Sequence, residues 1–338
     1  MDEKTRKDFI IHMTGKRGLA LRSVRVYLSQ FDVFLRHVGL YDNPEKVTNE
    51  IIVNYLSEMK IDYKKNANTR RLAKTAIESF YKWFSSYANI ENPATELAPI
   101  KKYINDPRFV TPDELEIMLK VIDERQKNAD IRRRNCAIIA LLADTGIRIE
   151  EFEKLRTGDV NIVRNSKKEV TNLELNISAV KGSHARVVPF ARLTDGDLCS
   201  EYFIRYYTWV IVEKKQAKDK PLFWHLKSSF RKEDTNKFLF RTGVRGVIER
   251  SVRDASIEKH VTPHMFRHFY GTYSYINGMD LVTIQHFMGH ARLSTTMQYI
   301  HVAERVAGIG LSHSATAGLK APKDVTGFSK IFRSFLKR

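Results

Sequence analysis

The chain has 338 residues and a net charge of +18 at pH 7, which favours a polyanionic partner, nucleic acid above all. Its length exceeds one average domain and its 43% hydrophobic content is enough to build buried cores, so we expect two domains. Only two cysteines occur and they lack metal-ligand spacing, which argues against a disulfide scaffold or a zinc site. Since no apolar run approaches membrane-spanning length, we expect a cytoplasmic protein without membrane attachment.

Residues 1–104 are expected to form a helical domain. Apolar residues recur at helical spacing over Ser23–Val38 and Thr69–Tyr87, and Thr48 is placed to cap a helix between them. A basic cluster adjoins the third helix: Lys64, Lys65, Arg70, Arg71 and Lys74. For any single cation of this cluster a solvated surface is the ordinary interpretation, but together they could hold DNA phosphates. Such contacts would position the protein rather than read bases.

Residues 92–107 are predicted to link two domains, because this segment contains three prolines and no periodic apolar pattern. We expect the second domain to cover residues 108–302. It begins with a helix that starts from Thr111, with Pro112 in its first turn and Asp113 and Glu114 complementing the helix dipole.

Two stretches of the second domain carry cations that could meet in one pocket. Arg148 follows a break at Thr145-Gly146 and opens a helix that contains Glu151. The carboxylate of Glu151 either orients Arg148 or belongs to an ordinary surface pair. From Asn172 to Phe190, apolar residues alternate on both sides of a turn, which predicts a β-hairpin with Lys181 near its tip.

The segment Val261–Val302 holds the densest set of polar groups. Pro263 is expected in the first turn of a helix that places His264 and Arg267 on one face, near an N-terminus that attracts anions. This end of the helix suits a phosphate. His268 should face away from these neighbours and serve a structural role.

The second half of this segment brings a histidine and a tyrosine close together in sequence. Asp280 is placed to cap a helix that Gly289 ends, and His290 follows directly. Ser294 is expected to cap the next, short helix, which should present Tyr299 readily. Each residue alone is ordinarily a packing group, but two histidines and an arginine around one tyrosine are what phosphoryl transfer to a phenol requires.

These motifs resemble those of the tyrosine recombinases, the phage-integrase and Xer type of enzyme. The resemblance rests on four blocks in the family's order: TGIRIEEFEKL, VKGSHARVVPF, TPHMFRHFYGT and FMGHARLSTTMQYIHV. It covers residues 109–302 strongly and the N-terminal third more weakly. It implies a mainly α fold with a small β-sheet or hairpin (α+β), in which a helical DNA-binding domain and a catalytic domain form a C-shaped clamp on DNA.

The resemblance also implies the reaction and the partners. Tyr299 would attack a DNA phosphodiester to give a 3′-phosphotyrosyl link, and strands would be rejoined through a Holliday junction without metal, ATP or another cofactor. The outcome would be integration, excision or dimer resolution. The partners would be double-stranded DNA with inverted-repeat sites and further copies of the chain, monomeric in free solution and tetrameric on two sites, in a prokaryotic cytoplasm.

Roles for the other site residues follow from the same resemblance. Arg148 and Arg267 would hold the charge of the transition state with planar guanidinium groups, and the resemblance favours a supporting role for Glu151. His264 would help remove the tyrosine proton. Lys181 would protonate the departing 5′ oxygen, and His290 would hydrogen-bond a non-bridging phosphate oxygen.

Two other classes of protein fit part of this pattern. A type IB topoisomerase would use similar chemistry but relaxes supercoils without pairing two sites. A DNA-binding regulator would share the charge without needing a full catalytic pocket. Within the pocket, Lys167 and Lys168 are the alternatives to Lys181 as proton donor.

Residues 303–338 are expected to form a tether and a terminal helix. Glycines and small residues come first and predict a flexible or extended segment. Apolar residues then recur on one helical face: Phe328, Ile331, Phe332, Phe335 and Leu336. The amphipathic helix that they predict either covers its own domain or docks on the catalytic domain of a neighbouring protomer.

Overall fold

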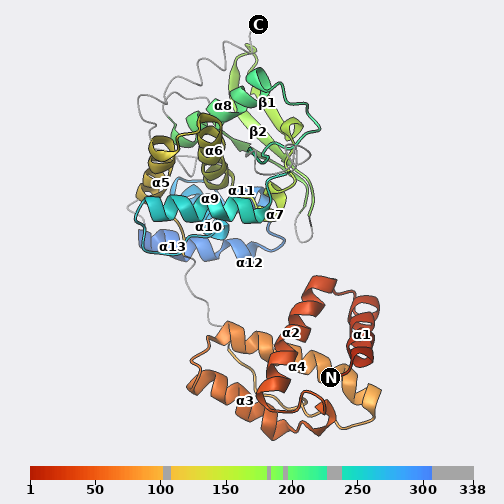
Figure 1. Cartoon of the computed structure of the whole chain (residues 1–338). Helices are drawn as coiled ribbons and strands as arrows, with labels where there is room; N and C mark the ends of the chain where they lie inside the picture. The colour runs from red at the N-terminus through yellow and green to blue at the C-terminus, as the bar shows by residue number, and fades with distance from the viewer. Residues whose placement is uncertain (102–107, 181–183, 193–196, 227–237, 307–338) are drawn as a thin grey trace. The chain divides into compact units, whose positions relative to one another are not determined.

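The computed structural model describes residues 1–101, 108–180, 184–192, 197–226 and 238–306 (Figure 1). The chain divides into two compact units, Met1–Asn105 and Asp106–Arg338, each with its own hydrophobic core. The described residues are mainly helical and include one three-stranded antiparallel sheet, which confirms the predicted fold class. Nowhere in this described part is a helix both long and apolar enough to cross a membrane. The predicted terminal helix lies outside the described residues.

The first unit is built around a long helix. Its helices are α1 (Glu3–Ile11), α2 (Leu21–His37), α3 (Asn49–Ile61) and α4 (Ala67–Ala88). The last of these packs on both α2 and α3, and the rings of Phe31 and Phe80 stack with centroids 3.8 Å apart. Thr48 caps α3 as predicted, by accepting a hydrogen bond from the backbone N–H of Ile51.

The predicted start of the third long helix was wrong by two residues. Helix α4 begins at Ala67 rather than at Thr69, because Asn66 is the N-cap and accepts a hydrogen bond of 2.9 Å from the backbone N–H of Thr69. Asparagine is among the strongest capping residues, so the shift has a local cause.

The second unit places helices around a buried central helix. Its helices are α5 (Pro112–Arg125), α6 (Ala129–Thr145), α7 (Ile149–Phe152), α8 (Leu198–Thr208), α9 (Arg241–Asp254), α10 (Pro263–Ile276), α11 (Leu281–Met288), α12 (Leu293–Thr296) and α13 (Gln298–Val306). Every residue of α6 from Arg134 to Thr145 is buried, and α5, α8 and α10 pack on it. Because its apolar side chains point in all directions, α6 is stable only when covered on all sides. The predicted start of α5 is confirmed, and Thr111 is its N-cap in a capping box with Glu114.

The sheet consists of β1 (Val160–Arg164), β2 (Val170–Ile177) and β3 (Arg186–Phe190), in that order. Strands β2 and β3 form the predicted hairpin, with Leu175 opposite Val188. Strand β1 was not predicted. Its five residues carry too little alternation to be told from a loop without the neighbouring strand.

Two glycines end the helices that meet near the predicted arginines. Gly146 ends α6 and Gly289 ends α11, with φ of 58° and 63°, in the left-handed region that favours glycine. Asp280 caps α11 by accepting hydrogen bonds from the backbone N–H groups of Val282 and Thr283. The predicted beginning and end of α11 are therefore confirmed.

Candidate active site

The two predicted arginines meet at the ends of α6 and α11. Arg267 of α10 donates to the carbonyl oxygens of Gly146, at 2.7 Å, and Met288, at 2.6 Å. Arg148, just before α7, donates to the carbonyls of Met288, at 3.3 Å, and Gly289, at 2.9 Å. Cations are stabilised at helix C-termini, where carbonyls carry partial negative charge. Burial and the nearby Arg148 lower the pKa of Arg267 to about 10, so the guanidinium stays charged at neutral pH.

The carboxylate of Glu151 binds Arg148 and lies inside the protein. It is 2% exposed, which excludes the interpretation as a surface pair. Its carboxylate accepts hydrogen bonds from the backbone N–H of Arg148 at 2.8 Å and from the same residue's guanidinium at 3.3 Å. It also accepts two bonds of 2.9 Å from Arg186 of β3, whose Nε donates to the carbonyl of Phe287 at 2.6 Å.

Arg186 was missed in the sequence, although a signal for it exists. It shares the buried face of β3 with Val188 and Phe190, since alternate residues of a strand point the same way. A charged side chain on such a face requires a charged or strongly polar partner inside the protein. Here that partner is Glu151.

Tyr299 lies on α13, which packs along α10 (Figure 1). It is 1% exposed, so the prediction that a short helix presents it readily was wrong. Gly271 of α10 makes room for it, because a Cβ there would come within 2.6 Å of Cε2 of Tyr299. Burial raises the pKa of Tyr299 to about 12, while Arg267 and Arg148 act in the opposite direction.

The predicted cap at Ser294 was also wrong. The short helix α12 spans Leu293–Thr296, so that Arg292 is its N-cap residue and makes no side-chain capping bond. Ser294 therefore lies inside this one-turn helix, and Tyr299 belongs to the following helix. The nucleophile candidate is thus fixed by the packing of α13 and not by a local cap.

Two histidines of α10 lie against each other, and one of them contacts Tyr299. The ring centroid of His268 lies 4.4 Å from that of His264 and 5.8 Å from that of Tyr299. The expectation that His268 faces away was wrong, because residues four apart share a helix face. Its Nδ1 is buried and has no hydrogen-bond partner among the described residues. Burial lowers the pKa values of both histidines, to about 3 for His268, with help from neighbouring charged groups.

His290 closes the other side of the site. Its ring lies nearly parallel to that of Tyr299, at 14° and with centroids 6.2 Å apart. The left-handed Gly289 turns the chain here, and Gln285 holds the His290 carbonyl with a bond of 3.0 Å. Burial and the nearby arginines lower the pKa of His290 to about 3. Its Nδ1 is 2.9 Å from the hydroxyl of Thr296, a second residue that the sequence alone did not single out.

Lys181 lies outside the described residues. The strands that lead to it are described: β2 ends at Ile177 and β3 begins at Arg186. Its role, and the alternatives Lys167 and Lys168, remain predictions.

The basic cluster of the first unit surrounds the start of α4. Asn66 caps this helix of 22 residues, whose N-terminus is itself favourable for an anion. Arg70 is partly buried, and Lys74 is paired with Glu78. The exposed members are Lys64, Lys65 and Arg71. Their contact with DNA remains a prediction.

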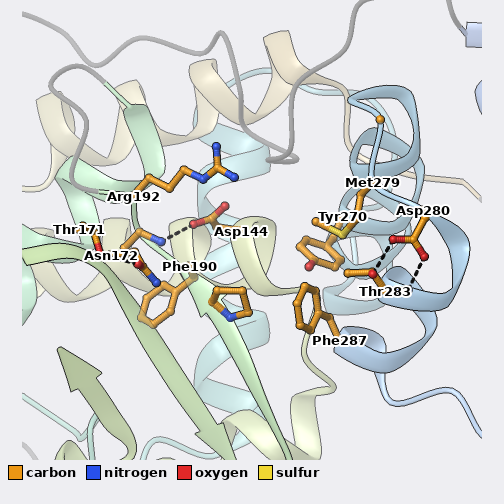
Figure 2. Close-up of a pocket in the computed structure, with 13 residues that line it drawn as sticks. Asp144, Thr171, Asn172, Phe190, Arg192, Tyr270, Met279, Asp280, Thr283 and Phe287 are labelled. Atoms are coloured by element: carbon orange, nitrogen blue, oxygen red, sulfur yellow. Dashed lines mark hydrogen bonds between the residues drawn. The ribbon is translucent and has the colours of Figure 1, made fainter. Parts of the chain in front are cut away.

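A hollow in the second unit lies apart from the predicted catalytic residues. It is a pocket of about 600 Å³ between the β2–β3 hairpin and helices α10 and α11 (Figure 2). In it Asp144 accepts a bond of 2.9 Å from the backbone N–H of Ala191. None of the predicted site residues lines this pocket. The candidate site is instead a set of converging side chains.

Comparison with known proteins assigns the chain to a family. The model of the phage integrase family matches residues 108–305. The chain belongs to this family. It is therefore a tyrosine recombinase, an enzyme that cleaves and rejoins DNA.

Sequence relatives extend over both units of this recombinase. It is 26% identical to tyrosine recombinase XerC of Lacticaseibacillus casei (strain BL23) over 296 residues, 86% of this chain and 91% of the relative. It is also 26% identical to tyrosine recombinase XerD of Oceanobacillus iheyensis over 304 residues, 88% of this chain and 93% of the relative.

Solved structures share the fold. The XerH site-specific recombinase in a post-cleavage complex with palindromic difH substrate has a TM-score of 0.65 at 19% identity, covering 86% of this chain and 79% of that one. A lambda integrase dimer bound to a COC′ core site has a TM-score of 0.62 at 16% identity, covering 88% and 76%.

Proposed function

We propose that this recombinase cleaves DNA at specific sites with Tyr299, forming a 3′-phosphotyrosyl link and a free 5′ hydroxyl, and rejoins strands through a Holliday junction. The carrying observation is that Arg148 and Arg267 lie near one buried tyrosine, whose ring contacts those of His290 and His268, with His264 against His268. The family match to integrases disfavours a topoisomerase-like relaxing enzyme and a regulator without catalysis.

Charge determines the role of the arginines. Attack on a phosphodiester builds negative charge on the non-bridging oxygens, and planar guanidinium groups hold that charge at fixed angles. Arg267 uses two of its N–H groups on the carbonyls of Gly146 and Met288, and its remaining N–H groups are left for phosphate. Arg148, with part of its side chain exposed, completes the clamp.

The proton of the nucleophile needs an acceptor. With a pKa near 12, Tyr299 does not ionise by itself at neutral pH. His264 is neutral there, because burial, Arg267 and Arg148 lower its pKa, and it accepts the proton as the bond from the tyrosine oxygen to phosphorus forms. The bond from phosphorus to the 5′ oxygen then breaks, and Lys181 supplies the proton to that oxygen.

The buried position of Tyr299 requires a movement before attack. Its oxygen reaches a DNA phosphate only when α13 shifts on α10 or the ring turns out of its seat beside Gly271. DNA binding at the arginines is the event that favours this shift. In the free protein Tyr299 is therefore buried and not yet placed for attack.

The finer parts of the proposal concern assembly. We propose that the chain is monomeric in free solution and forms a tetramer on two inverted-repeat sites in a prokaryotic cytoplasm, with the first unit holding DNA through Lys64, Lys65 and Arg71. The segment 303–338 would couple neighbouring protomers. Truncation before Asp324 would spare binding to one site and weaken the two-site complex, whereas an unchanged tetramer on paired sites would favour a tail that covers its own domain.

Two duplexes that carry the cognate site provide the test. Inverted repeats in the DNA flanking the coding region supply the candidates. Incubated with the purified protein, the duplexes should yield Holliday junctions and a covalent protein–DNA complex on denaturing gels. Relaxation of supercoiled plasmid without any junction would instead favour the topoisomerase-like alternative.

A further inference from the structure

His290 and Thr296 form a closed hydrogen-bonded pair at the edge of the site. The distance from Nδ1 of His290 to Oγ1 of Thr296 is 2.9 Å, and the two residues are 9% and 0% exposed. Thr296 is the last residue of α12, while His290 follows the left-handed turn at Gly289. The pair therefore links the two ends of the segment between α11 and α13.

The kind of partner decides which ring nitrogen carries hydrogen. A carbonyl or a carboxylate can only accept, and would hold the hydrogen on Nδ1. A hydroxyl can donate or accept, so Thr296 leaves both arrangements open in principle.

Because Thr296 is buried, the two arrangements differ in free energy. If Nδ1–H donated to Oγ1, the hydroxyl hydrogen of Thr296 would itself need an acceptor. Its only hydrogen-bond partner among the described residues is His290. A buried hydroxyl hydrogen without an acceptor is costly, whereas donation to Nδ1 satisfies both groups.

The surroundings of His290 keep the ring neutral, so that it has a single hydrogen. Three arginines lie near it, Arg148, Arg186 and Arg267, together with His268 and the ring of Tyr299. Adding a positive charge to this buried ring is unfavourable for both reasons, burial and repulsion.

We infer that Thr296 donates its hydroxyl hydrogen to Nδ1 of His290 and thereby fixes the ring hydrogen on Nε2, the nitrogen left for the DNA phosphate. Thr296 is thus a positioning residue that acts through His290, and this inference rests on the proposed role of His290. With the hydrogen on Nε2 the neutral ring donates to a phosphate oxygen. With the opposite tautomer a lone pair would meet that oxygen and repel it.

The ring hydrogen can be located directly in the DNA-free protein. In full-length protein labelled with ¹⁵N-histidine, long-range ¹H–¹⁵N spectra at pH 7 distinguish the two tautomers and the protonated ring, and the missing signal of His290→Asn assigns His290. We expect hydrogen on Nε2 in the wild type and in Thr296→Ser. In Thr296→Val, which keeps the shape but lacks the hydroxyl, a mixed or reversed tautomer is expected.

Single-turnover cleavage then connects the tautomer to the reaction. With a suicide substrate, Thr296→Val should cleave about tenfold more slowly, as the loss of one hydrogen bond allows, and Thr296→Ser should stay within about twofold of the wild type. Thr295→Val makes the same change at the exposed neighbouring residue and should alter neither spectrum nor rate. Thermal unfolding confirms that the variants are folded.

Three results would overturn the inference: hydrogen on Nδ1 or a doubly protonated ring in the wild type, an unchanged tautomer in Thr296→Val, or wild-type cleavage by that variant. Failure of the proposed function looks different. In that case the wild type forms no covalent complex with any substrate, while the spectra still report the tautomer.

Discussion

Arg267 and Tyr299 are both almost fully buried in the same site, yet different interactions hold them there. Arg267 is fixed by charged hydrogen bonds to two carbonyls at the ends of α6 and α11. Tyr299 is held by ring contacts with His268 and His290 and by its fit against Gly271. Directional bonds fix the angles of the arginine side chain, whereas packing of the Tyr299 ring is non-directional. In the DNA-free structure the arginine is therefore held by directional bonds and the tyrosine by the fit of its ring.

The strongest test of this contrast removes only the nucleophilic oxygen. Tyr299→Phe keeps the ring that packs on Gly271 and leaves the cations untouched, so DNA binding should persist while covalent trapping is abolished. Gel shifts measure the first property and suicide substrates on denaturing gels the second. A covalent species of normal yield from this variant would disprove the assignment.

Lysine substitutions at the two arginines should slow cleavage strongly. Arg267→Lys cannot bind the carbonyls of Gly146 and Met288 and present a planar fork to phosphate together, and Arg148→Lys loses the same geometry. Each variant should slow single-turnover cleavage by about 10²-fold or more. Near-normal rates in both would contradict the clamp.

A smaller effect is expected from the carboxylate beneath the arginines. Glu151→Gln removes the buried charge that Arg186 and Arg148 share, which should lower the free energy of unfolding by about 3 kcal/mol. Glu124→Gln makes the same change in an exposed pair with Lys120 and should cost under about 1 kcal/mol. Urea unfolding measures both losses. Equal losses would mean that the buried pair stabilises the protein no more than the exposed pair.

The smallest effect is expected from a substitution at Gly271, against which Tyr299 packs. Gly271→Ala places a Cβ against the Tyr299 ring, and the overpacking should lower the free energy of unfolding by about 1 to 3 kcal/mol. It should also speed hydrogen exchange in α13. Gly246→Ala in α9 is the control, because its Cβ would meet only the side chain of Arg250 at 3.5 Å. That variant should be neutral or slightly more stable, since alanine favours helix.

Local signals in the sequence predicted the parts of the fold that depend on local chemistry. Asp280, Thr111 and Gly289 begin or end helices through bonds within a few residues, and all three were recognised. The hairpin of β2 and β3 likewise follows from alternation around one turn. Strand β1 could not be recognised, because it is defined by its neighbour in the sheet.

The site shows the same division. Spacing and motif order named Arg148, Arg267 and His290, which the structure brings together. The burial of Tyr299 depends on how α13 lies on α10, and the pairing of Arg186 with Glu151 joins a strand to a helix 35 positions away. Such contacts arise only when distant segments pack, so the burial of Tyr299 and the pairing of Arg186 with Glu151 could not be read from spacing, although the alternation of β3 places Arg186 on its buried face.

If Arg267 binds the DNA phosphate as proposed, the carbonyls that hold it also affect the thermodynamics of DNA binding. A free arginine side chain samples many rotamers and loses that freedom when it grips a phosphate. In this protein folding has already removed that freedom, because Arg267 donates hydrogen bonds to the carbonyls of Gly146 and Met288. In the proposed reaction, binding of the phosphate would therefore carry a smaller entropic penalty, and a larger share of the interaction energy would remain for discriminating the transition state from the bound substrate.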